Sequence, residues 1–277
     1  MAPLKVLQIN INRCKAAHDI LEHFLKENQI DLVVITEPNK KIATTSDFIT
    51  DLDIDVAIKI VNKNIGFNKS HIDSGIVMID TDSIQILGGY FSPNKSNDEF
   101  EKYIEVIESV MRTYQKCIIA ADLNAHSVEW GCQVTDHRGR IVEDFMASNS
   151  IIVANEGNTA TFDINNRSSI VDVTLVPDHQ SQKLTGWKVL DTETLSDHKY
   201  VYFEFDSSEN GTQHLCSSIS GRFDSRTIKV EKFISLVEDI ITPIETAAEL
   251  NLAIQDICCK TMRKTESGNK KSRVLVE

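Results

Sequence analysis

Residues 117–127 read CIIAADLNAHS, a run of five small or apolar residues followed by an aspartate, a leucine and an asparagine. The content of the run is typical of a buried strand. Because successive side chains of a strand point to opposite faces, Asp122 and Asn124 are predicted to project to the same side where the strand ends. A carboxylate can take a proton from water while an amide holds the water or a phosphate in line for attack. An isolated Asp-Leu-Asn triplet is also well suited to an Asx turn at a strand end.

Eight further stretches between Leu4 and Phe205 have a similar strand-like content of β-branched and apolar residues. They are residues 5–11, 31–37, 55–61, 75–80, 83–91, 150–155, 169–176 and 199–205. Helical periodicity is found instead in residues 18–29, 97–114 and 140–148. In the second of these, one apolar face is formed by Phe100, Tyr103, Ile104, Ile107, Val110, Met111 and Tyr114. Since each helix has a single apolar face and several strands are apolar throughout, we expect two sheets packed together with helices outside, a four-layer α/β/β/α sandwich.

The chain has 277 residues and a formal net charge of −12. This length allows one large α/β domain, or a domain of about 200 residues with an appendage. The acidic balance argues against a nucleic-acid partner, because affinity for DNA comes largely from cations placed against phosphates. It is tolerable in an enzyme whose carboxylates bind a divalent cation, since the metal then supplies the local positive charge. We therefore expect DNA binding that is weak and sensitive to salt.

The six cysteines form no CxxC pair and no zinc-finger spacing, so we interpret them as reduced packing residues. No apolar run approaches the roughly 18 residues that span a bilayer. The N-terminus lacks the basic flank, long apolar stretch and cleavage site of a signal peptide. An intracellular protein with no membrane contact is predicted.

The composition changes after Phe205. Residues 206–222 are rich in Ser, Gly and Asn and are predicted to be a linker that ends a first domain at residues 1–205. Residues 223–277 are predicted to form a helical extension, with Pro243 as a helix-start signal inside it. The final residues are basic and then abruptly apolar, which suggests a fragment of a longer protein.

Ser196-Asp197-His198 directly precedes the last strand of the first domain. A single histidine at a strand entry is usually structural. With a buried carboxylate behind it, however, such a histidine stays protonated and can stabilise the negative charge of a phosphate in its transition state. Asp172 lies inside an apolar strand, where a charge is costly unless it is paired, and is the candidate for that carboxylate. Its other interpretation is a strand residue that faces solvent.

Three more polar residues lie where predicted strands end. Glu37 follows an apolar run, and Pro38 stops the strand and holds the carboxylate at its rim. A carboxylate in that place is a plausible ligand for Mg²⁺, which prefers few protein oxygens together with waters and substrate phosphate. Asn10 and Tyr90 lie near the ends of two other strands, and each alone would suit an ordinary turn-adjacent residue.

The order and strand-end placement of these residues resemble the motif series of the endonuclease/exonuclease/phosphatase superfamily, whose fold is that of DNase I. The series is Asn10, Glu37, Tyr90, Asp122-Leu123-Asn124, Thr161-Phe162, Asp172 and Ser196-Asp197-His198. The flanking sequence resembles the endonuclease domain of a non-LTR, LINE-type retrotransposon of the kind found in insects. It comprises LQININR at 7–13, TEP at 36–38, GYFSP at 89–93, ADLNAHS at 121–127 with Trp130-Gly131, and DHRG at 136–139. The resemblance covers Leu4 to Phe205, about three quarters of the chain.

The resemblance implies a metal site. Glu37 would hold Mg²⁺, for which Mn²⁺ is a possible substitute, with help from Asn10 and Asp197. A second acidic ligand is often found two places after the first asparagine of this series, where the present chain has Asn12. This departure weakens the case for a strongly bound second metal.

The resemblance also assigns the catalytic residues. Asp122 would activate the attacking water, while Asn124 and Tyr90 would position the phosphate. The pair of Asp172 and His198 would stabilise the pentacovalent transition state. The implied substrate is double-stranded chromosomal DNA, nicked in the nucleus by a monomeric enzyme. The exposed 3′ hydroxyl would prime a reverse transcriptase domain further along, and the helical extension would lead toward it or form an independent hairpin.

Two other functions compete with this interpretation. A phosphodiesterase or phosphatase of the same fold could act on a small molecule or lipid headgroup, which the acidic balance mildly favours. A decayed transposon copy could serve as a binding module, but every position of the series carries a chemically competent residue. The basic stripe typical of such a module is missing, since Arg13, Lys40, Lys95 and Arg138 are dispersed along the chain. The sequence gives no target preference.

Overall fold

The computed structural model describes residues 3–45, 47–114, 116–165, 167–206, 223–224, 228–238, 253–254, 257–258, 260–261 and 263–264. The chain divides into one unit at Met1–Asn210 and a second at Gly211–Glu277. In the second unit, β15 (Phe223–Asp224) pairs antiparallel with β16 (Arg263–Lys264), and α5 spans Val230–Glu238. The predicted linker after Asp206 lies outside the described residues, as does most of the predicted helical extension, Pro243 included.

Two six-stranded mixed sheets form the first unit. One has the order β13-β14-β1-β2-β4-β3. Its strands are β13 (Leu184–Val189), β14 (Val201–Phe205), β1 (Leu4–Asn10), β2 (Leu32–Thr36), β4 (Val56–Ile60) and β3 (Ile49–Thr50). Strands β1 and β2 run parallel, which places Asn10 opposite Thr36.

The other sheet has the order β5-β6-β7-β8-β12-β9. Its strands are β5 (Phe67–Asp73), β6 (Ile76–Thr81), β7 (Gln85–Tyr90), β8 (Cys117–Asp122), β12 (Asp172–Pro177) and β9 (Ile151–Val153). The register places Asp122 opposite both Tyr90 on the parallel strand β7 and Asp172 on the antiparallel strand β12. Tyr90, Asp122 and Asp172 therefore lie side by side at one end of these three strands.

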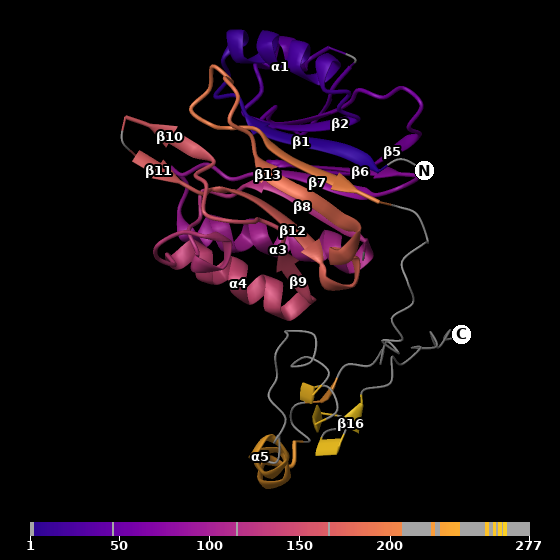
Figure 1. The fold of residues 1–277 in the computed structure, drawn as a ribbon, viewed down its shortest axis with the longest axis vertical. Coiled ribbons are helices and arrows are strands. Elements are labelled where there is room, and N and C mark those ends of the chain that lie inside the picture. The colour runs from indigo at the N-terminus through magenta and orange to yellow at the C-terminus, as the bar shows by residue number, and fades with distance from the viewer. Residues whose placement is uncertain are drawn as a thin grey trace, which may run out of the picture. The chain divides into compact units, whose positions relative to one another are not determined.

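The helices cover the outer faces of both sheets (Figure 1). The helical segments are α1 (Lys15–Glu27), α2 (Lys40–Ala43), α3 (Asn97–Thr113), α4 (His137–Asn149), and the 3-10 turns η1 (Val128–Trp130) and η2 (Asp178–Lys183). Leu21 of α1 packs in one buried cluster with Leu7 of β1, while Ile107 of α3 and Val142 of α4 share another with Ile119 of β8. The predicted α/β/β/α layering is confirmed.

A third buried cluster fills the space between the two sheets. Val6 and Val34 contribute from one sheet, and Ile118 and Val176 from the other. Strand alternation carries the inward positions of β1, β8 and β12 on to Asn10, Asp122 and Asp172. At one end of the sandwich the apolar layer thus gives way to buried polar side chains.

β15 and β16 of the second unit lie within residues 223–277, which were predicted to be helical. In the first unit, all nine predicted strands are present, together with five described strands that were not predicted. The unpredicted strands are β3, β5, β13, β10 (Phe162–Ile164) and β11 (Arg167–Ser169). β5 and β13 are edge strands, where one side of the ladder is unpaired and polar residues are tolerated. β10 and β11 form a separate hairpin of three-residue strands. None of these contains the apolar run that indicates a buried strand.

Among the residues described, no helix combines the length and the apolar character needed to cross a bilayer.

We predict that Gly88→Ala destabilises the sandwich by about 1–3 kcal/mol, the usual cost of overpacking a core. A Cβ atom at Gly88 would lie 2.8 Å from Val34 Cγ1 and 3.0 Å from Val56 Cγ1, both on the facing sheet. Chemical denaturation of the two proteins would measure the difference. Gly66→Ala is the control, since its Cβ would meet only the flexible carboxylate of Asp82. Equal stability of Gly88→Ala and the wild type would contradict this account of the sheet contact.

Candidate active site

Asn10 joins two carboxylates that are far apart in the sequence. Its side-chain Nδ2 donates to Glu37 Oε2 at 3.1 Å and to Asp122 Oδ2 at 2.9 Å. Its Oδ1 accepts the backbone N–H of Asn12 at 2.7 Å, and its backbone carbonyl accepts Ser196 Oγ at 2.7 Å. Every polar group of this fully buried amide thus holds another part of the site in place.

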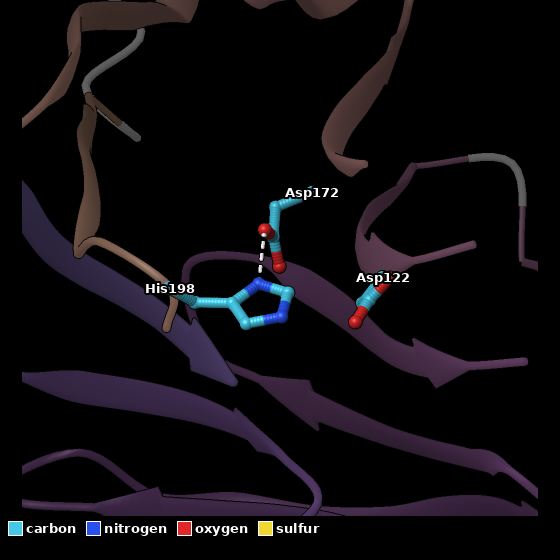
Figure 2. A group of neighbouring side chains, drawn as sticks. All are labelled: Asp122, Asp172 and His198. Carbon is cyan, nitrogen blue, oxygen red and sulfur yellow. Dashed lines mark hydrogen bonds and ion pairs between the residues drawn. The ribbon is translucent and has the colours of Figure 1, made fainter. Parts of the chain in front are cut away.

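Asp172 and His198 form a buried pair, 1% and 7% exposed. His198 Nδ1 lies 2.8 Å from Asp172 Oδ2, and the second ring nitrogen is directed toward Asp122 (Figure 2). The ring also packs edge-on against Phe162, with 5.0 Å between the centroids. Thr161 Oγ1 accepts the backbone N–H of Asp172, which fixes the strand that carries the carboxylate.

The surroundings of His198 keep it protonated. Burial by itself lowers the pKa of the imidazole, but the charge and hydrogen bond of Asp172 outweigh it. More distant carboxylates, Asp122 and Glu37, act in the same direction, and together they raise the pKa of His198 to about 9. The site therefore presents an imidazolium at neutral pH.

Asp122 is the central carboxyl group and is only 1% exposed. Burial, followed by the charge of Asp172, raises its pKa above the ordinary value for an aspartate. His198 and the hydrogen bond from Asn10 offset part of this effect. Asp122 is therefore a stronger proton acceptor than a solvent-exposed aspartate.

Asn124 is placed by a turn. We predicted that it would continue the alternation of the strand, but β8 ends at Asp122 and Asn124 has a left-handed φ of 45°. Its backbone N–H donates to Asp122 Oδ1 at 3.2 Å, and its Nδ2 donates to the carbonyl of Phe91 at 3.1 Å. The Asx turn is present, and it is the backbone N–H of Asn124 that bonds the Asp122 carboxylate, while the side-chain amide bonds Phe91.

Tyr90 ends β7 beside Asp122 and is buried. Burial and then the charge and hydrogen bond of Glu37 raise the pKa of its phenol well above the ordinary value. The hydroxyl thus remains a hydrogen-bond donor throughout the physiological pH range.

Several residues of the site adopt a left-handed backbone. Glu37 has a φ of 44°, while Asn12 and Arg13 have φ of 45° and 55°. Such conformations cost about 1–3 kcal/mol each for most non-glycine residues and are concentrated at functional sites. Two hydrogen bonds of 2.8 Å hold the Glu37 backbone. The N–H of Glu37 donates to the carbonyl of Asp55, and the N–H of Arg13 donates to the carbonyl of Glu37. The fold thus imposes the position of the Glu37 carboxylate.

Asp197, a predicted metal ligand, is linked to the Asn10 group through Asn12, whose Nδ2 donates to Asp197 Oδ2 at 3.2 Å. Arg13 is a further member that was not predicted, with its Nε 4.0 Å from Glu37 Oε1 and its guanidinium paired with Asp55. Its position three residues after Asn10 did not reveal this role, because the contact depends on the left-handed turn.

The carboxylate oxygens of the site suit a divalent cation, whereas His198 would have to lose its proton to act as a ligand. Asp122, Asp172 and His198 offer ligand atoms that all lie within 4.8 Å of one another, and Asp172 Oδ1 is buried with no hydrogen-bond partner. The Asn10 amide bonds Asp122 and links it to Glu37. A cavity of about 250 Å³ borders Asp197 and His198, and another of about 550 Å³ borders Asn124. The predicted site residues thus come together, apart from Asp197, which reaches the group through Asn12.

Comparison with known proteins agrees with this arrangement. Residues 84–202 match the family model described as Endonuclease-reverse transcriptase, and this range includes Tyr90, Asp122, Asp172 and His198. None of the curated proteins compared with the sequence matches it. The family match therefore covers every member of the predicted series except Asn10 and Glu37.

Solved structures share the fold. The endonuclease domain of TRAS1, a telomere-specific non-LTR retrotransposon, is 25% identical with a TM-score of 0.67, over 73% of this chain and 98% of that one. An AP endonuclease from Archaeoglobus fulgidus is 15% identical with a TM-score of 0.57, over 73% and 99% of the two chains. The 3′ phosphatase NExo from Neisseria, bound to a product DNA hairpin, is 13% identical with a TM-score of 0.56, over the same shares. These last two show the common fold. The family match and the likeness to the TRAS1 domain agree with the resemblance to the endonuclease/exonuclease/phosphatase superfamily, and in particular to the endonuclease domains of non-LTR retrotransposons, and the chain shares their DNase I-like fold.

Proposed function

We propose that this protein is a divalent-metal-dependent endonuclease that nicks double-stranded DNA. The observation that carries the proposal is the buried pair of Asp172 and His198 beside Asp122, which Asn10 joins to Glu37. A protonated imidazole, a carboxyl group of raised pKa and an oxygen-rich rim are the parts that hydrolysis of a phosphodiester requires.

Asp122 is proposed to act as the general base. Its raised pKa increases the driving force for taking a proton from water, while Asn10 and the backbone N–H of Asn124 orient its two oxygens. Asn124 and Tyr90 flank this carboxyl group and would orient the scissile phosphate and the attacking water in line.

His198 is proposed to stabilise the charge that develops on the phosphate. Its Nδ1 is engaged by Asp172, which leaves the second ring nitrogen to donate to a phosphate oxygen. Because the pair is nearly excluded from water, such a hydrogen bond is stronger than it would be at the surface.

Glu37, Asn10 and Asp197 are proposed to hold the metal ion. Oxygen ligands of this kind favour Mg²⁺, with Mn²⁺ as a substitute. When bound, the ion would neutralise charge on the phosphate and lower the pKa of a coordinated water. His198 is a poorer ligand than the oxygen donors at neutral pH, since its raised pKa keeps the imidazole protonated.

The proposed biological role is target-primed reverse transcription, in which the nick exposes a 3′ hydroxyl for a reverse transcriptase domain of the same polyprotein. The match to the Endonuclease-reverse transcriptase family and the likeness to the TRAS1 endonuclease domain support it. Such an enzyme would act in the nucleus, as a monomer. Because the net charge of the protein is −12, its affinity for DNA would be low and sensitive to salt.

We predict that the protein converts supercoiled plasmid to the open circle in the presence of Mg²⁺, and that a chelator stops the reaction. Asp122→Ala and His198→Ala should each lower the rate about 10²–10⁴-fold, the usual contribution of a general base or of a charge-stabilising group. Gel quantification of the nicked product measures both effects. Asp82→Asn, in the turn between β6 and β7, is the matched control and should leave the rate unchanged. Undiminished nicking by either site variant would contradict the proposed mechanism. If the protein releases phosphate from inositol phosphates and does not nick DNA, its substrate is a small molecule.

The pH dependence of nicking should be bell-shaped. Activity requires Asp122 as a carboxylate, so it is lost as the pH falls through the raised pKa of this group. It also requires His198 as an imidazolium, so it is lost as the pH rises through about 9. Asp172→Asn removes the main cause that raises the pKa of His198 and should move the alkaline limb to lower pH. An alkaline limb that stays in place in this variant would show that another group controls it.

Metal binding should depend on Glu37 more than on His198. We expect Glu37→Gln to weaken Mn²⁺ or Mg²⁺ binding about tenfold or more, as measured by isothermal titration calorimetry, because a charged oxygen ligand is lost. His198→Gln should leave the affinity close to that of the wild type. The opposite order would assign the ion to the group of Asp122, Asp172 and His198 instead.

A further inference from the structure

Arg138 is a buried cation without a carboxylate partner. It lies in the first turn of α4, within the Asp136-His137-Arg138-Gly139 stretch, and is only 8% exposed. Among the ion pairs of the described residues, none includes Arg138. Burying an unpaired charge is costly, and an apolar residue of similar volume would often give a more stable core. The guanidinium must therefore be compensated by other polar groups.

That compensation comes from backbone carbonyls. Nη1 donates to the carbonyls of Ser92 and Asn124 at 3.4 and 3.3 Å. Nη2 donates to the carbonyl of Pro93 at 3.3 Å and to that of Lys95. Three of these carbonyls belong to the loop between β7 and α3, and the fourth belongs to the loop after β8. One side chain thus ties two loops together.

Two aromatic rings complete the surroundings of the guanidinium. Its central carbon lies 5.0 Å from the ring centroid of Phe91 and 5.4 Å from that of Phe100. Such cation–π contacts are stabilising when the cation is desolvated. They also orient the plane of the fork, so that its donors face the loop carbonyls.

The start of α4 is itself anchored to the loop after β8. Asp136 caps the helix by accepting the N–H of Gly139 at 2.7 Å, and it binds His126 Nδ1 at 2.9 Å. A Cβ atom at Gly139 would lie only 1.9 Å from the carbonyl oxygen of His126, so glycine is required for this close approach. The position of Arg138 is thus fixed by its neighbours on both sides.

Both loops lead directly to the candidate site. Tyr90 immediately precedes Phe91, and the Phe91 carbonyl accepts the side chain of Asn124. Asn124 has the left-handed φ of 45° and is bonded by Arg138 through its own carbonyl. Arg138 touches neither Asp122 nor His198, so its effect on chemistry would pass through the loops.

We propose that Arg138 is a positioning residue, whose guanidinium holds the Tyr90 and Asn124 loops in the relative placement that phosphodiester hydrolysis needs. The proposal rests on the proposed function for its catalytic consequence, while the loop contacts themselves stand on the geometry. A fork of fixed donors is required, so lysine cannot replace it, although lysine keeps the charge.

The test compares Arg138→Lys, Arg138→Met and Val142→Ala in the full chain. Val142 lies one turn further along α4, in the buried cluster that contains Phe91 and Phe100, and its side chain has no polar group, so its truncation serves as a stability control. Plasmid nicking is measured well below the melting temperature of each protein. Both Arg138 variants should lose about 10–100-fold in kcat with a smaller change in KM, because misplacement of positioning groups costs this much. Val142→Ala should keep the kcat of the wild type despite a lower Tm.

Hydrogen exchange followed by mass spectrometry gives a readout that does not depend on activity. Amides of residues 91–96 and 123–127 should exchange faster in both Arg138 variants than in Val142→Ala. Wild-type kcat and exchange in Arg138→Lys would show that only the charge matters and overturn the proposal. An equal loss of kcat in Val142→Ala, or unchanged loop exchange, would reduce Arg138 to a stability role and also overturn it. If the wild type does not nick DNA, the proposed function fails, whereas the exchange result still decides whether Arg138 holds the loops.

Discussion

The site depends on the burial of several acidic side chains at one end of the sandwich. Asp122 and Asp172 face each other across adjacent strands and are both almost inaccessible to water. Two carboxyl groups so placed repel each other unless a cation or hydrogen-bond donors compensate them. His198 supplies one positive charge, and the Asn10 amide supplies donors to Asp122 and Glu37. The remaining negative charge at the rim is what makes a divalent cation a natural occupant.

The fold holds this arrangement with more than hydrogen bonds. Glu37 and Asn124 are kept in left-handed backbone conformations, each tied to neighbouring loops through its backbone or amide. A site with this much imposed geometry loses little freedom when the substrate binds, which is the physical basis of preorganisation. The apolar sandwich below the rim supplies the rigidity, because its buried layer is shared by both sheets.

The acidic balance of the chain and its proposed DNA substrate are compatible in these terms. Phosphate recognition at the centre would be supplied by His198 and by the metal ion, rather than by a broad basic surface. The buried Arg138 contributes no such surface, since its donors are directed at four backbone carbonyls. Sequence specificity would then come from the loops around the site. Loops can vary in shape and charge more than the strands and helices that they connect.

The sequence by itself determined the layered fold and the identities of the polar strand ends, because apolar runs and helical periodicity are local properties that appear within a few residues. It did not reveal the polar edge strand β5, whose residues need not be apolar because an edge is only partly covered. Only the tertiary structure decided that Asn10 bridges Glu37 and Asp122, or that Arg138 joins two loops. These contacts link residues from distant parts of the chain through turns of unusual backbone conformation. Local composition predicts neither the register of the sheets nor the left-handed φ of Glu37.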